Sequence, residues 1–495
     1  MLLHILAGMW GAANYFVSVF RGTPILPWDF KALGTAVAVA GSYSLSITWQ
    51  IAICIMLIAL LAWALRPYYK MGHFRPRKGD LLRRGSVLIA GLLCLIPIAH
   101  PQILGMFGVE TDVWDQLGAY QTGGAAAEFL RNTEFMEVEK PDDTTPERVN
   151  AIVNGAEDDP TPNVGVDHPN IVAIMNESWA DFEDFGNLTL TESPMNYINS
   201  VSNAIHGHSY TSVFGAGTST SEFEFLTGNS MNFLPSGSIP YQQYINGDLK
   251  ALPDYLKNLG YQTIATHPYN AGGWERDTVY PMLGFNESVF KDDYVNPQYV
   301  RQYISDESCV DKIIEFYENK EKDAPLFVFN VTMQNHGGYQ DQYGNFTPDI
   351  SVKDSTNFSL QQYLSLVKLS DSALEHLISY FEEADEKTVI VFFGDHQPSD
   401  AVASTVLAKN GMSWNHLTEE QQKLRYQVPY VVWANYDIGE ETGADTSVNY
   451  LAAEVLERAG VPLDEYRSYL LHLKSEYPVC LLYTSPSPRD YAASR

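Results

Sequence analysis

The sequence predicts an α/β protein in which N-terminal transmembrane helices precede a domain with a mainly parallel sheet between helices. Two observations carry this prediction. Three hydrophobic stretches lie in the first 109 residues, and short apolar runs alternate with longer helical patterns after residue 168. Long apolar stretches are typical of membrane spans, and continuous apolar strands separated by helices are typical of a sheet buried on both faces.

Charge divides the chain near residue 109. Residues 1–109 contain nine Lys and Arg against two Asp and Glu, a balance of +7, whereas residues 110–495 carry −36. The acidic part contains no cluster of Lys and Arg residues of the kind that binds nucleic-acid phosphates, which argues against a nucleic-acid partner. An acidic domain also repels anionic ligands at long range, so an anionic substrate needs a local positive centre.

The stretches 2–20, 47–65 and 86–109 are each near the length of a membrane span, although polar residues and proline interrupt the third. The loop 66–84 between the second and third stretches contains seven Lys and Arg. Basic loops stay in the cytoplasm, so we expect residues 1–109 to form about three spans and the remaining chain to face outward.

A helical connector and an acidic linker are predicted over residues 110–168. The last sixteen residues, CLLYTSPSPRDYAASR at 480–495, break from the preceding helical pattern and are interpreted as a non-native tail. The four cysteines form no recognisable disulfide framework.

Five apolar runs predict the strands of the outer domain, with helical patterns between them such as residues 360–383. The runs are NIVAIM (170–175), YQTIAT (261–266), LFVFNVT (326–332), TVIVFF (388–393) and PYVVWAN (429–435). Parallel sheets carry their sites at the carboxyl ends of the strands. We therefore expect function in the residues that follow these runs.

The segment FGAGTSTSEFEF, residues 214–225, places four hydroxyl residues behind two glycines. A local explanation is a helix start, since Ser219 and Glu222 have the spacing of a capping box. A functional explanation is that one hydroxyl is a nucleophile at a helix N-terminus, where free amides stabilise an incoming phosphate. The segment alone leaves both interpretations open.

Polar residues do follow the strands: Glu177 after the first, His336 after the third, and Asp395 with His396 after the fourth. Singly, such residues often cap helices or satisfy core hydrogen bonds. Together with a hydroxyl from TSTS they predict a single metal site for attack on phosphorus or sulfur. Two carboxylates, a hydroxyl and one imidazole suit manganese or magnesium better than a thiolate-type zinc site.

The motifs NES, GTSTSEFEF, HPYNAGGWERDTVYPMLGF, NVTMQNHGGY and FFGDHQP resemble those of the lipoteichoic acid synthase-like phosphoglycerol transferases, in the sulfatase and alkaline phosphatase superfamily. The resemblance begins near residue 21, where RGTPILPWDF is similar to a family loop between spans. It implies a sulfatase-like catalytic domain over residues 169–465, with 466–479 as its C-terminal end.

The resemblance also implies residue roles. The nucleophile falls on Thr218, and the metal ligands are Glu177, Thr218, Asp395 and His396. Substrate-binding roles fall on Trp274, Arg276 and His336, of which the last two also have catalytic roles. The family has Asn where this chain has Glu275, a carboxylate that could repel phosphate or pair with Arg276.

The implied activity is transfer of glycerol phosphate from phosphatidylglycerol to a cell-wall polymer, with a glycerol-phosphate or glycolipid acceptor. The implied enzyme is a multi-pass protein of a bacterial cell membrane with an extracellular catalytic domain and one divalent metal ion: Mn²⁺, with Mg²⁺ or Zn²⁺ as alternatives. Competing interpretations are a related hydrolase, a phosphoethanolamine transferase and a non-enzymatic wall-polymer binding module. The C/S-x-P-x-R context of formylglycine sulfatases is missing around Thr218, which counts against sulfatase activity.

Overall fold

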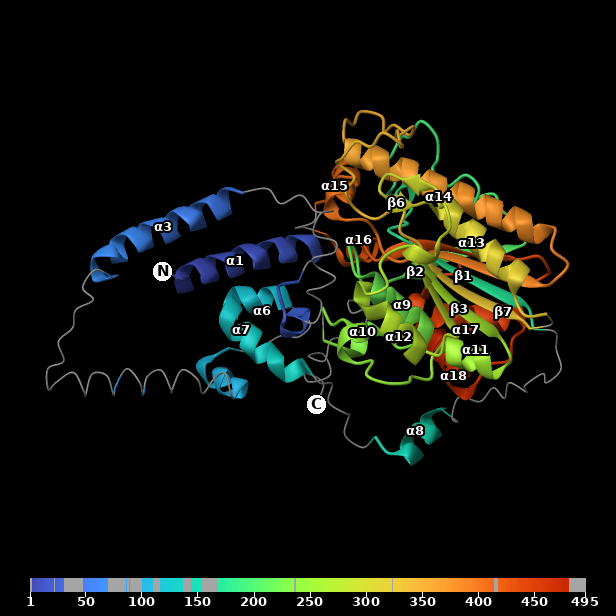
Figure 1. Ribbon diagram of the computed structural model, residues 1–495, viewed down its shortest axis with the longest axis horizontal. Helices are drawn as coiled ribbons and strands as arrows, with labels where there is room; N and C mark the ends of the chain where they lie inside the picture. Colours follow the sequence, from blue (N-terminus) through green and yellow to red (C-terminus); the bar gives the residue numbers. More distant parts are fainter. Residues whose placement is uncertain are drawn as a thin grey trace. The chain divides into compact units, whose positions relative to one another are not determined.

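The computed structural model describes residues 2–21, 23–30, 48–69, 86, 89, 100–109, 116–136, 144–153, 168–235, 237–322, 324–413 and 417–479. The chain divides into two compact units (Figure 1). The smaller unit comprises residues 1–33, 43–138 and 235–238, and the larger comprises 34–42, 139–234 and 239–495. The domain limits expected at 109, 168, 465 and 479 stay predictions.

The smaller unit is helical. Its elements are α1 (Leu2–Arg21), η1 (Pro27–Phe30), α3 (Trp49–Tyr69), η3 (Pro101–Phe107), α6 (Gln116–Gly123), α7 (Ala125–Asn132) and η4 (Thr133–Met136). Leu26 and Trp28, from the predicted family loop, are buried against Tyr120. The Tyr120 hydroxyl donates to the Ile25 carbonyl at 2.8 Å, which ties this loop to α6.

No helix within the described residues combines the length and the apolar character needed to cross a membrane. The three expected spans therefore stay a prediction. Half of the third stretch, the acidic linker at 154–167, most of the basic loop and the tail at 480–495 lie outside the described residues.

The larger unit is built on a nine-stranded mixed sheet. The strands along the main path run in the order β10-β2-β9-β8-β1-β7-β3-β4, and β11 pairs with β2. The central strands β8, β1, β7, β3 and β4 are mutually parallel, whereas β9 is antiparallel to both of its neighbours. The predicted α/β class with a mainly parallel sheet is confirmed.

The strands of this unit are β1 (Asn170–Asn176), β2 (Ala204–Tyr210), β3 (Gln262–His267), β4 (Glu287–Phe290), β5 (Tyr299–Val300), β6 (Tyr303–Ile304), β7 (Leu326–Val331), β8 (Thr388–Gly394), β9 (Gln427–Ala434), β10 (Glu441–Thr442) and β11 (Thr446–Ser447). The α-helices are α8 (Pro146–Val153), α9 (Thr218–Thr227), α10 (Pro240–Gln243), α11 (Leu252–Asn258), α12 (Arg276–Met282), α13 (Asp306–Asn319), α14 (Phe358–Glu382), α15 (Asp400–Lys409), α16 (Glu419–Lys423), α17 (Val448–Ala459) and α18 (Glu465–Glu476). Short 3₁₀ turns are η5 (Glu183–Phe185), η6 (Met231–Phe233), η7 (Gly273–Glu275) and η8 (Lys291–Asp293).

Two hydrophobic cores lie on opposite faces of the sheet, because successive side chains of a strand point to opposite sides. On one face of β1, Val172 and Ile174 belong to the core that is covered by α13, α14 and α15. On the other face, Ile171, Ala173 and Met175 belong to the core that is covered by α9, α11, α12 and α17. Figure 1 shows these two helical layers on either side of the strands. This double burial explains why the strands read as continuous apolar runs.

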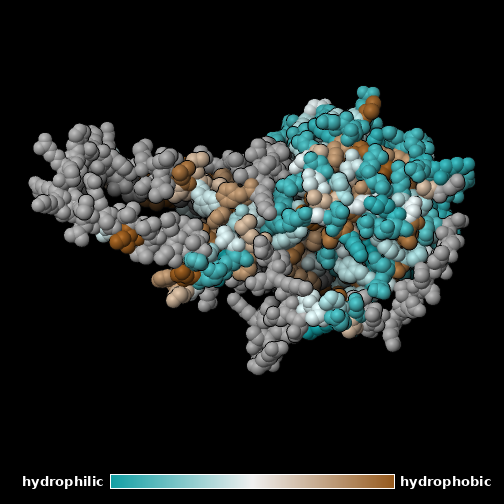
Figure 2. Space-filling view, turned by 60° about the horizontal axis from the view of Figure 1, so that its bottom comes forward, coloured by the Kyte–Doolittle hydropathy of each residue, from teal (hydrophilic) through white to brown (hydrophobic). Residues whose placement is uncertain are grey.

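All five predicted strands are present, and the helix expected at 360–383 is α14. Six strands were missed, and four of them, β5, β6, β10 and β11, have only two residues each. The sequence AIHGHSY of β2 lacks a continuous apolar run because its central residues are only half-buried, and β4 has four residues with an exposed start. On the face drawn in Figure 2, the described side chains of the larger unit are mainly hydrophilic, and hydrophobic side chains appear on described parts of the smaller unit.

Candidate active site

Strand register brings the first two site residues together. Asn176 of β1 pairs with Gly394 of β8, so Glu177 and Asp395 leave the sheet side by side. A side chain at Gly394 would place its Cβ 2.1 Å from the Trp179 carbonyl oxygen, so this position has no room for one. The Asp395 N–H donates to the Asn176 carbonyl at 3.1 Å, which continues the ladder by one residue.

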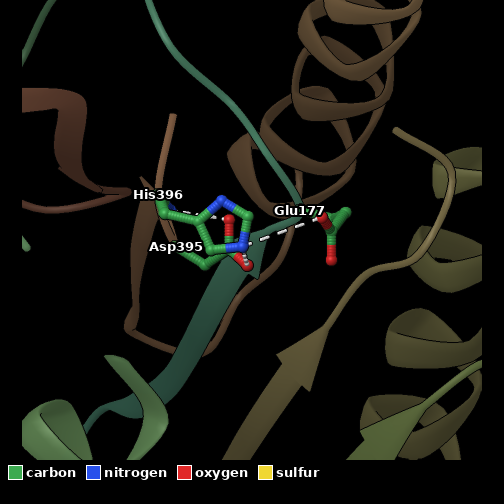
Figure 3. A group of neighbouring side chains, drawn as sticks. All are labelled: Glu177, Asp395 and His396. Carbon is green, nitrogen blue, oxygen red and sulfur yellow. Dashed lines mark hydrogen bonds and ion pairs between the residues drawn. The ribbon is translucent and has the colours of Figure 1, made fainter. Parts of the chain in front are cut away.

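Glu177, Asp395 and His396 form a compact buried trio (Figure 3). One ligand atom of each residue lies within 4.8 Å of the others. The His396 Nε2 atom is 3.2 Å from Asp395 Oδ2 and 4.0 Å from Glu177 Oε1. A second group with metal-ligand spacing, formed by Glu307, Asp311 and His376, is partly exposed on α13 and α14. The buried trio lies where the sequence predicts the metal site.

The donor set of the trio fits a divalent cation. The His396 Nδ1 atom lies 2.9 Å from the Gln397 carbonyl, which leaves Nε2 facing the Asp395 and Glu177 carboxylates. The Asp395 Oδ2 atom is buried and accepts no hydrogen bond from the described residues. The pKa of Asp395 is raised to about 7: burial is the main cause and the charge of Glu177 adds to it, whereas His396, Thr218 and the Ser178 amide act to lower it. The Oδ2 atom of Asp395 and the Nε2 atom of His396, with Glu177 beside them, are ligand atoms that a metal ion would bind.

Ser178 joins the two carboxylates, a role that the sequence did not reveal. Its N–H donates to Asp395 Oδ1 at 2.7 Å and its hydroxyl donates to Glu177 Oε1 at 2.7 Å. The residue has φ +50°, a left-handed conformation that is uncommon for residues with a side chain. Strained backbone of this kind clusters at functional sites. The only available signal was the position of Ser178 directly after Glu177 at a strand end.

Thr218 is the first residue of α9, and its Oγ1 donates to Glu177 Oε2 at 3.4 Å. The turn into α9 needs Gly217, because its φ is +109° and a Cβ there would lie 3.1 Å from Val213. The geometry therefore presents one hydroxyl to the trio at a helix N-terminus, where free amides favour an anion. The structure brings together all four residues predicted as metal ligands.

The predicted capping box is wrong. The N-cap of α9 is Gly217, and no side chain caps the first turn. The Ser219 hydroxyl is buried without a hydrogen-bond partner in the described part of the chain. Glu222 turns away from the helix start to pair with Arg276, so tertiary pairing replaces the local hydrogen bond that the spacing suggested.

Glu222 and Arg276 form a buried ion pair. The Arg276 Nη2 and Nε atoms donate to Glu222 Oε1 at 2.5 and 3.0 Å, and the hydroxyls of Tyr280 and Tyr241 donate to Oε2 at 2.8 and 3.2 Å. Burial lowers the pKa of Arg276, but the charge and hydrogen bond of Glu222 together with Tyr280 and Tyr241 outweigh burial and leave that pKa above its usual range. The partner of Arg276 is thus Glu222, whereas Glu275 is exposed. Substrate binding by Arg276 stays a prediction.

His336 lies on the loop after β7, within electrostatic range of Glu177 and His396. Its Nδ1 atom is 3.1 Å from the Tyr303 hydroxyl, and the two rings pack edge to face. Burial lowers the pKa of His336, the carboxylate of Glu177 opposes this shift, and the charges of Arg301 and His396 add to it. A neutral imidazole that can exchange a proton is suited to general acid–base work. Trp274 is half-buried with φ +58° in η7, and its predicted contact with substrate stays a prediction.

These features define a class of protein: an α/β enzyme with a candidate metal site and a buried hydroxyl at the carboxyl edge of a mainly parallel sheet. Residues 169–461 match the sulfatase family. The chain belongs to the sulfatase family, and the predicted resemblance to phosphoglycerol transferases of the sulfatase and alkaline phosphatase superfamily is confirmed.

Two curated relatives are informative. The chain is 31% identical over 377 residues to a candidate cyclic β-1,2-glucan modification protein of Rhizobium meliloti (strain 1021), covering 74% of this chain and 57% of the relative. It is 24% identical over 222 residues to a lipoteichoic acid synthase-like protein of Bacillus subtilis (strain 168), covering 43% of this chain and 34% of the relative. The chain thus spans about half or less of the length of these relatives.

Among solved structures, the chain is similar to the phosphoglycerol transferase GacH of Streptococcus pyogenes in complex with sn-glycerol-1-phosphate. The TM-score is 0.58 at 21% identity, over 72% of this chain and 92% of GacH. At this identity the likeness establishes the fold, and activity has to be argued from the site.

Proposed function

We propose that this protein transfers the phosphoglycerol group of phosphatidylglycerol to a hydroxyl of a cell-envelope polymer. The observation that carries the proposal is the Thr218 hydroxyl, which donates to Glu177 at the start of α9 beside the buried Asp395–His396 pair. A hydroxyl is a weak nucleophile, and this arrangement offers both a way to activate it and a way to bind a phosphate.

In the first step the Thr218 oxygen forms a bond to the lipid phosphorus while the bond from phosphorus to the diacylglycerol oxygen breaks. The hydroxyl proton leaves toward the Glu177 carboxylate that already accepts it, and the departing oxygen takes a proton from His336 or from water. A divalent cation held by Glu177, Thr218, Asp395 and His396, with manganese as our choice, would lower the hydroxyl pKa and offset the phosphate charge.

In the second step a hydroxyl of the acceptor attacks the phosphorus of glycerophospho-Thr218, and the Thr218 oxygen leaves with a proton. His336 is hydrogen bonded through Nδ1 to Tyr303, which leaves its other ring nitrogen to take the proton from the acceptor. Without an acceptor, water would complete the same cycle, and the enzyme would then act as a phosphodiesterase.

The acceptor is proposed from the relatives. The name of the Rhizobium meliloti relative refers to the modification of a cyclic β-1,2-glucan, and that of the Bacillus subtilis relative to lipoteichoic acid synthase. An acceptor hydroxyl on a sugar or glycerol unit of an envelope polymer is consistent with the names of both relatives. We favour a carbohydrate acceptor because the glucan-related relative shares the higher identity over the longer alignment.

The proposal includes anchorage in a bacterial cell membrane through residues 1–109, with the larger unit outside. The basic loop 66–84 supports this orientation. Large apolar side chains of the smaller unit are also exposed, among them Leu6, Met9, Ile55, Met56 and Trp63. Exposed apolar side chains on neighbouring helices are what a lipid environment favours.

The test uses the full chain in vesicles that contain phosphatidylglycerol and Mn²⁺, without acceptor. We expect release of diacylglycerol and a phosphoglycerol adduct on the peptide that carries Thr218, both lost in Thr218→Ala. The control Ser219→Ala removes the neighbouring hydroxyl and should keep both signals. An adduct on another residue of TSTS would refute the assignment, and turnover of phosphatidylethanolamine alone would favour the phosphoethanolamine transferase.

A further inference from the structure

Arg301 is a buried arginine in the turn between β5 and β6, and no carboxylate of the described residues pairs with it. The residue is 4% exposed and has φ +56°. Its guanidinium lies over the rings of Tyr339, Tyr303 and Tyr343, at 5.3, 5.6 and 5.8 Å from their centroids. Aromatic faces stabilise a cation only in part, so they do not replace a counter-ion.

The hydrogen bonds of Arg301 are incomplete. Its Nη2 atom donates to the carbonyls of Gln334 and His336, both at 2.7 Å. Its Nε and Nη1 atoms are buried and have no acceptor within the described residues. Buried donors without a partner cost free energy, and a buried charge without a partner costs more.

Other buried arginines of the larger unit do have partners. Arg276 pairs with Glu222 at 2.5 Å, and Arg467 pairs with Asp464 at 2.5 Å while it lies 4.4 Å from the ring centroid of Tyr255. Arg467 therefore has the same kind of burial and stacking as Arg301, together with the carboxylate that Arg301 lacks. The comparison identifies the missing partner of Arg301 as an anion.

Arg301 also belongs to the neighbourhood of the candidate active site. It binds the backbone of His336, and the Tyr303 side chain under its guanidinium contacts the His336 ring. Burial lowers the pKa of Arg301, and among carboxylates Glu177 acts to raise it. A ligand that reaches His336 thus enters the region where the free N–H groups of Arg301 need an acceptor.

We propose that Arg301 is a substrate-binding residue whose unused Nε and Nη1 groups donate to a phosphate oxygen of the glycerol phosphate group. Arginine suits this role because its charge persists in a buried site and its planar donors match phosphate oxygens. The inference rests on the proposed function and extends it by naming the group that recognises the anion beside His336. The phosphate belongs either to the donor lipid headgroup or to a glycerol phosphate unit of the acceptor.

A structural alternative is that Arg301 only clamps the loop that carries His336, through its two carbonyl contacts. The test therefore measures ligand binding apart from folding. Manganese-loaded full chain in detergent is titrated with sn-glycerol 1-phosphate by calorimetry, with glycerol as the uncharged comparison. The variants are Arg301→Gln, Arg301→Lys and the control Arg467→Gln, and thermal unfolding is recorded for each.

We expect Arg301→Gln to weaken glycerol phosphate binding by about 10-fold to 100-fold, the range for lost hydrogen bonds to a charged group. Arg301→Lys keeps the charge but not the fixed donor geometry, and should weaken binding by about 3-fold to 10-fold. The control Arg467→Gln should lower thermal stability but leave the affinity unchanged. Unchanged affinity in folded Arg301→Gln would overturn the proposal; if that variant does not fold, unchanged affinity in folded Arg301→Lys would do so.

The two sources of phosphate are separated by the half-reactions. Slower formation of the Thr218 adduct from phosphatidylglycerol, without acceptor, would assign Arg301 to the donor phosphate. A normal adduct rate with slower transfer to a glycerol phosphate acceptor would assign it to the acceptor. If wild-type protein forms no adduct from any phospholipid while glycerol phosphate binding still depends on Arg301, the proposed function fails and this inference stands.

Discussion

Replacing Glu222 with Gln should destabilise the protein far more than the loss of a helix cap would. In the structure both oxygens of Glu222 are used, by Arg276 at 2.5 Å and by Tyr280 and Tyr241. Gln keeps the volume and one acceptor oxygen but removes the negative charge. The Arg276 guanidinium is then buried without a counter-ion, which costs about 3–5 kcal/mol for a buried pair broken on one side. A lost N-terminal cap costs about 0.5–2 kcal/mol.

The assay is urea denaturation of the metal-loaded full chain in detergent, followed by tryptophan fluorescence. The matched control is Ser219→Ala, which alters the other half of the predicted capping box. Because the Ser219 hydroxyl has no hydrogen-bond partner within the described residues, its removal should change the unfolding free energy by less than about 0.5 kcal/mol. The difference between the unfolding free energies of the two variants thus distinguishes a buried ion pair from a capping box.

A double-mutant cycle tests the pairing itself. The combined variant Glu222→Gln, Arg276→Gln contains two neutral amides. Its loss of unfolding free energy should be smaller than the sum of the two single losses by at least about 2 kcal/mol. Additive single effects, or a cost below about 1 kcal/mol for Glu222→Gln, would refute the interpretation of a buried pair that holds α9 against α12. Activity of a folded double variant would further show whether Arg276 also serves the substrate.

Three further predictions follow. Asp395→Asn should reduce both manganese content, measured by elemental analysis, and turnover, and full metal content with normal turnover would contradict the ligand assignment. Burial raises the pKa of Glu224 to about 7, so the folded state holds a proton that the unfolded chain has lost. Stability should therefore fall as pH rises from about 4.5 to 7, by up to about 3 kcal/mol, and Glu224→Gln should flatten that pH dependence in denaturation curves. For topology, a cysteine replacing Asp158 should react with an impermeant thiol reagent in intact cells and one replacing Gly79 only after permeabilisation; the reverse pattern would place Thr218 in the cytoplasm.

Much of the catalytic unit could be predicted from the sequence, because burial on both faces forces a strand to be apolar along its whole length. That pattern located β1, β7 and β8 and thereby the residues that follow them. Parallel pairing then makes Glu177 and Asp395 neighbours, since strands that run together end at the same edge. Strand β2 was not predicted because its half-buried His206 and His208 interrupt the apolar run.

Side-chain partners were harder to predict than elements. Glu222 and Arg276 are 54 residues apart, and nothing in either motif indicates that they meet. The spacing of Ser219 and Glu222 favoured a local hydrogen bond, but a buried carboxylate gains more from a guanidinium and two tyrosines than from a backbone amide. Ser178 and Arg301 were missed for a related reason: a single Ser or Arg has no sequence pattern that reveals which atoms surround it.

The pairing of Arg276 changes where the positive charge of the site comes from. The segment after residue 109 carries −36, so an anionic substrate needs a compensating centre at the point of reaction. Arg276 was predicted to bind the substrate, yet its guanidinium is paired with Glu222 within the core. Besides the free amides at the start of α9, two candidate centres within the described residues are the cation that the trio fits and the unpaired guanidinium of Arg301. If both act on phosphate, metal removal and Arg301→Gln should each weaken glycerol phosphate binding, and their combined effect should exceed either one alone.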